Sequence, residues 1–307
     1  MSTLNIFLTS VFLFGLIGLA LIYGRPEGSR YIDELNRFIT ITLKMYLVRI
    51  FGHRFLNFFD YIFNRRNPVT LILYLVLLIG GYTMFVFKGY PHVSDTHRFL
   101  GFFLFCASLF FFLRACTVDP GIIHKNNHKE CLSQFPFDEI IFFPSKICTT
   151  CKMTKPARSK HCSVCNVCVS RFDHHCIWIN QCVGYGNAKH FHAFLFFNNL
   201  ICLYGGFLGI SIFRDIILEG NLLNTTFRDA KTSQQYPSSY FYVGMYLLGK
   251  EPLLVYITLF SGIMGIFLLA FSYYHFVKLA GITTNESAKL GSLAKEKRAA
   301  FRQIHCS

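Results

Sequence analysis

Charged residues are scarce in this chain of 307 residues, because Asp, Glu, Lys and Arg together make up 15% of it. Soluble domains carry about 25% charged residues, so the shortage excludes an ordinary soluble domain. Negatively charged residues are rarer than positively charged ones, with 16 Asp and Glu against 30 Lys and Arg, and the net charge is +14. On a chain with a mean hydropathy of +0.40, such a basic excess is typical of the cytosolic side of a membrane protein and does not indicate a nucleic-acid partner.

The N-terminus lacks two features of a cleaved signal peptide. Residues 1–3 carry no positive charge, and no cleavage site of small residues follows the apolar stretch Leu4–Tyr23. We therefore expect this stretch to stay in the protein as a membrane span. The sequence also lacks internal repeats and low-complexity tracts, so it does not indicate a repeat architecture.

Long apolar runs are abundant, and a helix needs about 20 predominantly apolar residues to cross a bilayer. The stretches that qualify are Leu4–Tyr23, Val69–Phe87, Phe99–Val118, Phe191–Phe213 and Leu253–Val277. The segment Phe38–Phe51 is apolar too, but Lys44 and Arg49 interrupt it, so we predict an amphipathic helix that lies on the membrane. The alternative is that this segment crosses the membrane, which would invert the side of every later loop. The run Tyr240–Gly249 is too short to span and is predicted to be interfacial. The predicted fold class is an all-α polytopic membrane protein with about five transmembrane helices and a small cytosolic cysteine-rich domain of short β-hairpins between spans 3 and 4.

Lys and Arg are distributed unevenly between the segments that connect these spans. Regions 24–67, 118–190 and 278–307 hold 23 of them, whereas residues 1–3, 89–97 and 214–252 hold three when the span-edge residue Arg214 is left out. Because cytosolic loops carry the positive excess, we predict a lumenal N-terminus and a cytosolic C-terminus. The N-glycosylation sequon at Asn224 falls in the predicted lumenal loop, which agrees with this orientation.

This topology predicts four regions along the chain. Residues 1–118 form spans 1 to 3 with a basic interfacial segment 24–67, residues 119–190 a cytosolic cysteine-rich domain, residues 191–277 spans 4 and 5 with a lumenal loop 214–252, and residues 278–307 a short basic cytosolic tail. The tail includes Cys306, for which a free thiol is the simplest expectation.

Seven of the twelve cysteines lie between Cys148 and Cys182, a clustering that argues against a secreted disulfide scaffold. Three C-x2-C pairs with His between them, in a cytosolic segment, strongly indicate zinc. The block offers ten candidate ligands, and two closed four-coordinate sites need eight of them. The side chains of the adjacent residues His161 and Cys162 point opposite ways in an extended segment, which predicts that they bind different ions in interleaved sites.

The surplus is expected within Asp173-His174-His175-Cys176, and the spacing leaves two interpretations open. In one, Cys176 is a nucleophile activated by an imidazole that a carboxylate orients. In the other, all four residues are structural, with His174 and Cys176 as metal ligands and Asp173 bonded to a ligand.

The block resembles the DHHC family of protein S-acyltransferases (palmitoyltransferases), whose cysteine-rich domain lies in the cytosol between two membrane spans. The matching residues run from Cys148 to Asn187 and include Lys155-Pro156-Ala157-Arg158, His161-Cys162, Asp173-His174-His175-Cys176, Trp178, Asn180, Cys182 and Gly184. Two outlying motifs agree, Asp119-Pro120-Gly121 after the third span and Thr283-Thr284-Asn285-Glu286 after the last. The chain departs from many members in its extra N-terminal span and in its short tail, which lacks the family's aromatic C-terminal motif.

The resemblance implies a role for each residue of the block. One structural zinc ion would take Cys148, Cys151, His161 and Cys168, and the other Cys162, Cys165, His175 and Cys182. Cys176 would be the nucleophile, His174 its general base and Asp173 the group that polarises His174. Lys155, Arg158 and Lys160 are candidates to bind the phosphates of acyl-CoA.

The resemblance also implies an activity and a location. The expected reaction transfers a palmitoyl group from acyl-CoA, through a thioester on Cys176, to cysteines of protein substrates at the cytosolic membrane face. The endoplasmic reticulum or the Golgi is the expected compartment. The alternative is a catalytically inactive membrane scaffold that uses the zinc module to bind proteins, and the intact Asp173-His174-His175-Cys176 set favours the enzyme.

Overall fold

The computed structural model describes residues 53–54, 57–58, 60–228, 234–278 and 281–305. The chain divides into two compact units, and the larger, Arg65–Leu290, contains every membrane span and site residue discussed below. The predicted first span Leu4–Tyr23, the predicted interfacial segment Phe38–Phe51 and Cys306 lie outside the described residues.

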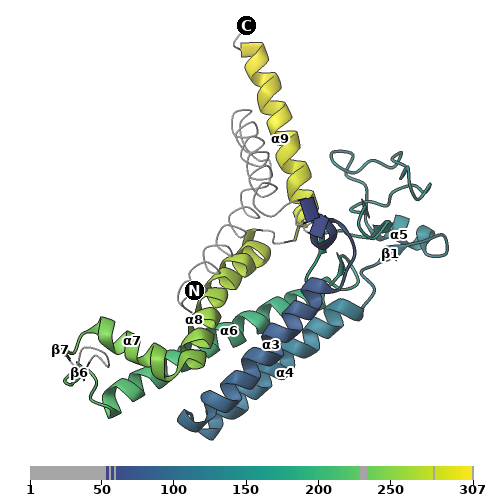
Figure 1. Ribbon diagram of the computed structural model, residues 1–307. Helices are drawn as coiled ribbons and strands as arrows, with labels where there is room; N and C mark the ends of the chain where they lie inside the picture. Colours follow the sequence, from purple (N-terminus) through teal and green to yellow (C-terminus); the bar gives the residue numbers. More distant parts are fainter. Residues whose placement is uncertain (1–52, 55–56, 59, 229–233, 279–280, 306–307) are drawn as a thin grey trace. The chain divides into compact units, whose positions relative to one another are not determined.

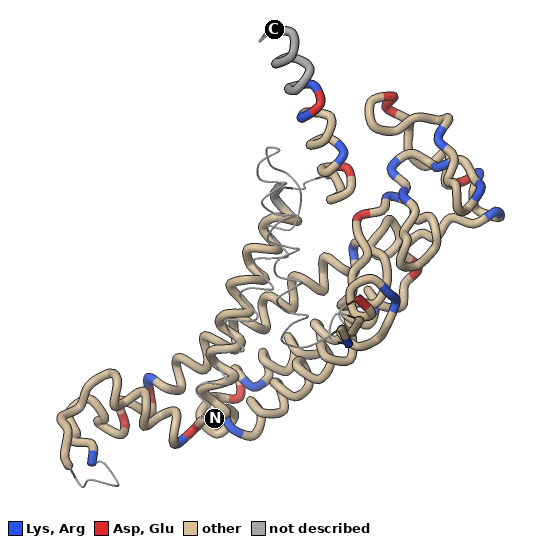
Figure 2. The backbone as a smooth tube through the Cα atoms, turned by 45° about the horizontal axis from the view of Figure 1, so that its top comes forward, with Lys and Arg blue, Asp and Glu red and all other residues tan. Residues whose placement is uncertain are grey.

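Four helices of the described part are long and apolar enough to cross a membrane. They are α3 (Val69–Lys88), α4 (Asp95–Thr117), α6 (Ala188–Glu219) and α8 (Pro252–Tyr273), the last continued by the π-helical turn η2 (Tyr274–Lys278). In Figure 1, α6 lies between α4 and α8, and it packs against both. These helices correspond to the predicted spans 2 to 5, which confirms the polytopic helical fold. Figure 2 shows that the spans are almost free of charged positions, whereas Lys and Arg gather along the cysteine-rich domain.

Small residues bring α6 and α8 close together. A Cβ atom added at Gly206 would lie 3.0 Å from the Gly262 backbone, and one at Gly209 would lie 2.0 Å from Thr258 Oγ1. Close approach at small residues is the usual basis of helix association in membranes, where no hydrophobic effect drives it. By contrast, an added Cβ at Gly80 of α3 would meet nothing within 4 Å.

The cysteine-rich domain contains short strands and one short helix, α5 (His128–Gln134). Strands β1 (Ile122–Ile123), β3 (Val167–Val169) and β2 (Lys160–Cys162) form an antiparallel sheet in that order, and β4 (His174–Cys176) pairs with β5 (Gln181–Val183). The expectation of short β-hairpins between the third and fourth spans is therefore confirmed. Helix α9 (Thr284–His305) follows the last span, and its first turn carries the Thr-Thr-Asn-Glu motif.

The opposite ends of the spans carry more structure than we expected. Helix α6 continues past the predicted end at Phe213 to Glu219, and a hairpin of β6 (Thr226–Arg228) and β7 (Gln235–Pro237) follows it. Helix α7 (Tyr240–Lys250) begins where the Ser239 hydroxyl accepts a hydrogen bond from the Tyr242 N–H, and Pro252 at once begins α8. At about 1.5 Å per residue α7 is too short to cross a bilayer, as its sequence predicts. The turn η1 (Tyr90–His92) links α3 to α4 at this end.

Candidate active site and metal centres

The β4–β5 hairpin carries the Asp-His-His-Cys sequence and has two chemically different faces. Because successive side chains of a strand point to opposite faces, His174 and Cys176 share one face and His175 lies on the other. The register pairs His175 with Cys182 and Cys176 with Gln181, and directly paired residues share a face. The hairpin therefore presents a His and a Cys to each side.

The β2–β3 hairpin separates its side chains in the same way. Its register pairs His161 with Cys168, while Cys162 is paired with Val167 and faces the other side. The adjacent residues His161 and Cys162 therefore join different groups of ligands.

Eight Cys and His side chains gather in two groups of four, and within each group all ligand atoms lie within 4.8 Å of one another. The groups are Cys148, Cys151, His161 and Cys168, and Cys162, Cys165, His175 and Cys182. Cys151 Sγ lies 3.4 Å from His161 Nδ1, and Cys165 Sγ lies 3.3 Å from His175 Nδ1. Three thiols and one imidazole are a donor set typical of structural zinc, so each group could hold a metal ion.

The C-x2-C turns of the two groups have the same local geometry. In each turn the backbone N–H of the second cysteine donates to the sulfur of the first at 3.4 Å, from Cys151 to Cys148 and from Cys165 to Cys162. The residue that follows each turn has a positive φ, 56° at Lys152 and 56° at Asn166. A donated N–H favours the thiolate form that binds metal.

Cys176 belongs to neither group of four and lies beside a His–Asp pair. His174 Nδ1 is 3.2 Å from Asp173 Oδ2, and the His174 imidazole interacts electrostatically with the Cys176 thiol. The thiol of Cys176 is buried, and the carboxylate of Asp173 is nearly so. The residues that the sequence singled out are thus joined in the order Cys176, His174, Asp173.

The electrostatics of this chain favour a charged His–Cys pair. Burial alone raises the pKa of Cys176, but its interaction with His174 and the N–H groups of residues 179 and 178 lower it below the ordinary value. Burial lowers the pKa of His174, but Asp173 and Cys176 raise it to about 9. Burial likewise opposes ionisation of Asp173, yet His174 and Thr284 bring the pKa of this carboxyl far below its usual range. A thiolate next to an imidazolium is the nucleophilic form of cysteine.

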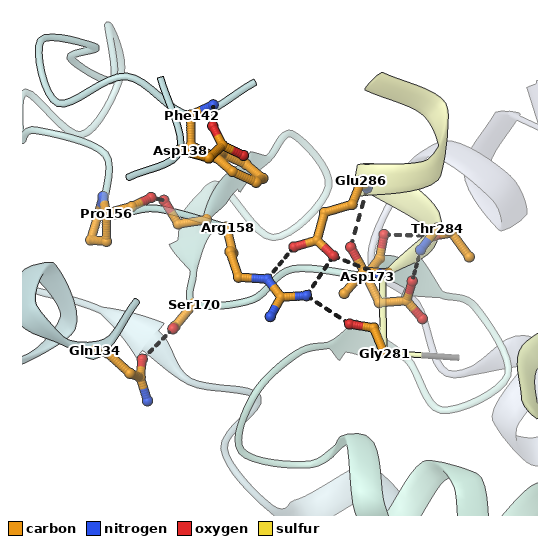
Figure 3. Close-up of polar contacts among 12 residues, drawn as sticks. Gln134, Asp138, Phe142, Pro156, Arg158, Ser170, Asp173, Gly281, Thr284 and Glu286 are labelled. Carbon is orange, nitrogen blue, oxygen red and sulfur yellow. Dashed lines mark hydrogen bonds and ion pairs between the residues drawn. The ribbon is translucent and has the colours of Figure 1, made fainter. Parts of the chain in front are cut away.

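The Thr-Thr-Asn-Glu motif of α9 supports Asp173 from the side opposite His174. The Thr284 N–H donates to Asp173 Oδ1 at 2.5 Å, and the Thr284 hydroxyl donates to the Asp173 backbone oxygen at 2.9 Å (Figure 3). Thr283 and Glu286 bond each other reciprocally, Thr283 N–H to Glu286 Oε2 at 2.8 Å and Glu286 N–H to the Thr283 hydroxyl at 3.2 Å. This is a capping box, which fixes the start of α9 next to Asp173.

Arg158 joins the same assembly. Its Nη2 donates to Glu286 Oε2 at 2.7 Å and to the Gly281 oxygen at 3.0 Å, and its Nε bonds Glu286 Oε1 (Figure 3). The guanidinium that the resemblance offered to acyl-CoA is therefore engaged by α9. Phosphate binding by Arg158 stays a prediction, and it would have to compete with these bonds.

Four lysines cluster next to this assembly. Burial lowers the pKa of Lys289, and three neighbouring ammonium groups lower it further. Those neighbours are Lys146, Lys160 and Lys155. Lys155 and Lys160 were predicted as cations for acyl-CoA. Lys146 and Lys289 were not, because each lies just outside the stretches that match the family.

The face of the hairpin that carries Cys176 packs against the ends of the spans. Cys176 belongs to an apolar cluster with side chains of α3, α4 and α6. Its buried members are Tyr74, Phe112, Ala115, Ile179, Val183, Phe191, Phe194 and Leu195. The ring of Phe191 also meets the His174 ring edge-on, 5.4 Å between centroids. The Cys176 thiol thus lies at an apolar boundary between the cysteine-rich domain and the spans.

Asn224, the predicted glycosylation site, is exposed in the loop between α6 and β6, at the end of the spans opposite the cysteine-rich domain. Its side chain donates to Asn221 Oδ1 at 2.8 Å.

Comparison with known proteins agrees with this arrangement. The family model described as DHHC palmitoyltransferase matches residues 141–291. Palmitoyltransferase swf1 of Schizosaccharomyces pombe is 34% identical over 309 residues, which cover 94% of this chain and 80% of that protein. Palmitoyltransferase SWF1 of Neurospora crassa is 38% identical over 48% of this chain and 35% of its own length. Palmitoyltransferase ZDHHC4 of Bos taurus is 32% identical over 46% of this chain and 43% of its own length.

The fold and the site define a polytopic membrane protein whose cysteine-rich domain has two Cys3His groups and a separate Cys-His-Asp chain. The chain belongs to the DHHC palmitoyltransferase family, since a relative above 30% identity is matched over most of its length. The matched region spans 35% of the length of the Neurospora crassa protein and 61% of that of palmitoyltransferase swf1 of Emericella nidulans.

Proposed function

We propose that this protein transfers a palmitoyl group from acyl-CoA to cysteines of other proteins, through an acyl thioester on Cys176. One observation carries the proposal. Cys176 is left out of both metal-binding groups and is linked to His174 and Asp173, on the face of the hairpin that meets the membrane spans.

In the first step the Cys176 thiolate attacks the thioester carbonyl of acyl-CoA. A new bond forms between Cys176 Sγ and the acyl carbon, the bond to the CoA sulfur breaks, and the leaving thiolate takes a proton from the imidazolium of His174. Asp173 holds His174 through its Nδ1, 3.2 Å away, and leaves Nε2 for this transfer.

In the second step the thiol of a protein substrate gives its proton to the neutral His174 and attacks the acyl group on Cys176. The Cys176 thiolate leaves and the His174 imidazolium is restored. Each step exchanges one thiol for another, so the reaction needs no oxidant and little free energy.

We propose that both groups of four hold zinc and that zinc is structural. Each group supplies a full tetrahedral set of ligands, which leaves no position for water or substrate. His175 and Cys182 would bind one ion from the face of the hairpin opposite Cys176, so metal binding would hold the strand that presents Cys176 without using that thiol.

The surroundings of Cys176 suit the two ends of acyl-CoA. The apolar cluster at the ends of α3, α4 and α6 would receive the acyl chain, at up to about 0.8 kcal/mol for each buried CH2. The four clustered lysines, Lys146, Lys155, Lys160 and Lys289, would bind the phosphates. The mutual repulsion of these ammonium groups is relieved when an anion binds between them.

We propose a cytosolic cysteine-rich domain with protein substrates at the cytosolic face of the endoplasmic reticulum or Golgi membrane. The excess of Lys and Arg on that side supports this orientation. Asn224, at the other end of the spans, would then be lumenal and a glycosylation site. Removal of glycans should increase the mobility of the wild-type chain on a gel and leave Asn224→Gln unchanged, and an equal mobility shift in both proteins would contradict the proposed site.

The activity is tested by labelling the purified full-length protein with a clickable palmitoyl-CoA analogue, wild type beside Cys176→Ser, with zinc measured on the same samples. We expect label that hydroxylamine removes on the wild type alone, with two zinc ions per chain in both proteins. Loss of zinc as well as label in Cys176→Ser would instead identify Cys176 as a metal ligand. A folded, zinc-loaded wild type without label would contradict the transferase proposal and favour a scaffold.

A further inference from the structure

Two side chains, through three hydrogen bonds, tie the strand pair around Cys176 to the ends of two membrane spans. The first is that of Gln181, directly across the hairpin from Cys176. Gln181 Nε2 donates to the backbone oxygen of Ala115 at 2.5 Å and to that of Val118 at 3.0 Å. Ala115 lies in the last turn of α4 and Val118 is its C-cap, where backbone carbonyls have no partner within the helix.

The second side chain comes from α3. The buried hydroxyl of Thr70, in the first turn of that span, donates to the backbone oxygen of Ile177 at 2.5 Å. Ile177 is the residue next to Cys176 in the chain. The spans therefore hold the hairpin at two positions next to Cys176, α3 at residue 177 and α4 at residue 181.

We propose that Thr70 and Gln181 are positioning residues that fix the depth of Cys176 relative to the spans and thereby set the acyl-chain length the enzyme prefers. This inference rests on the proposed transferase activity. The acyl carbonyl must lie at Cys176 and the acyl chain among the spans, so the position of that thiol decides how many methylenes fit.

The direction of the effect follows from the side-chain lengths. Asn at position 181 has the same amide and one methylene less, so both bonds to α4 can be kept only if the hairpin moves closer to that helix. Cys176 then lies deeper and leaves room for a shorter chain. A displacement of about one methylene corresponds to roughly a fourfold change in relative preference, from about 0.8 kcal/mol for a buried CH2. Thr70→Val removes a bond without changing shape, which leaves the depth less defined.

The experiment measures self-acylation of the purified full-length protein with myristoyl-, palmitoyl- and stearoyl-CoA, each alone and in competition. The variants are Gln181→Asn and Thr70→Val. Matched controls carry the same substitutions away from Cys176. They are Gln134→Asn, whose side chain accepts a bond from the Ser170 hydroxyl at 2.6 Å, and Thr258→Val, whose hydroxyl donates within α8 to the Leu254 oxygen at 2.7 Å.

We expect the myristoyl-to-palmitoyl ratio to rise about fourfold in Gln181→Asn and to move toward one in Thr70→Val, while both controls keep the wild-type ratio. An unchanged ratio in both variants, or an equal change in the controls, would overturn the proposal. Zinc content is measured throughout. If Gln181→Asn loses zinc, Thr70→Val decides the question, because Thr70 lies outside the cysteine-rich domain. Absence of any label on the wild type would instead refute the transferase activity itself, and this proposal with it.

Discussion

The contact between Glu286 and Arg158 holds the start of α9 against the cysteine-rich domain, and Glu286→Gln is the substitution that tests it. The Glu286 side chain is 3% exposed and that of Arg158 is 24% exposed. Breaking a fully buried pair costs about 3–5 kcal/mol. The partial exposure of Arg158 reduces that to about 2–3 kcal/mol, since water screens the charge that is left alone.

The free energy lost with the Glu286–Arg158 ion pair should appear as easier local opening of the first turn of α9. About 2 kcal/mol corresponds to a roughly 30-fold faster hydrogen exchange of the backbone amides that docking protects. The most informative amide is that of Thr284, which donates to Asp173 Oδ1 at 2.5 Å. Hydrogen exchange followed by mass spectrometry of the fragment around residue 284 measures it. Glu130→Gln, an exposed carboxylate in α5, is the control. Unchanged protection in Glu286→Gln would refute this role of the ion pair.

The pH dependence of the same effect has a definite sign. Burial raises the pKa of Glu286, but Arg158 and the Thr283 N–H lower it more, so its pKa in the folded protein is below the ordinary value. A carboxylate of this kind stabilises the fold fully above its unfolded-state pKa, near about 4.3, and loses that contribution as pH falls through the lower value. We therefore expect the difference between wild type and Glu286→Gln to be constant from about pH 6 to 8 and to vanish in acid.

Three further outcomes are expected. Asp173→Asn should lower self-acylation at least about 100-fold while zinc stays bound, because His174 loses the carboxylate that orients it, and an undiminished acylation rate would contradict its role. Gly209→Ala should destabilise the helix pair by about 1–3 kcal/mol in thermal unfolding, because its Cβ would lie 2.0 Å from Thr258 Oγ1, whereas Gly80→Ala should be neutral. Removal of metal with a strong chelator should abolish self-acylation and increase proteolysis between residues 148 and 182, and full activity without metal would argue against structural zinc.

Much of the fold was predictable because membrane spans and metal ligands leave local patterns in the sequence. Four spans follow from apolar length, and the separation of His161 from Cys162 follows from the alternation of side chains along a strand. The same alternation applies to His175 between His174 and Cys176. It could not be used before the structure, because nothing in the spacing established that these residues form a strand.

The supports of the site were not predictable in this way. Arg158 and Glu286 are 128 residues apart, and Thr284 and Asp173 are 111 apart, so no local periodicity relates them. In the sequence, the motif after the last span contributes only to the family resemblance. Arg158 is a candidate to bind the phosphates of acyl-CoA only because it is a cation on the matching stretch. Lys289 could not be predicted as a neighbour of the lysines of the cysteine-rich domain, because only the docking of α9 brings it close to them.

The most direct test of the central claim is to map the acyl group itself. Wild-type protein is incubated with palmitoyl-CoA without any substrate protein, digested, and the peptide that contains Cys176 is analysed by mass spectrometry before and after hydroxylamine. We expect one palmitoyl group on Cys176, removed by hydroxylamine, while the eight Cys and His residues of the two metal groups remain unmodified. A palmitoyl group found only on another cysteine, or none on a zinc-loaded protein, would contradict the assignment of Cys176 as the nucleophile.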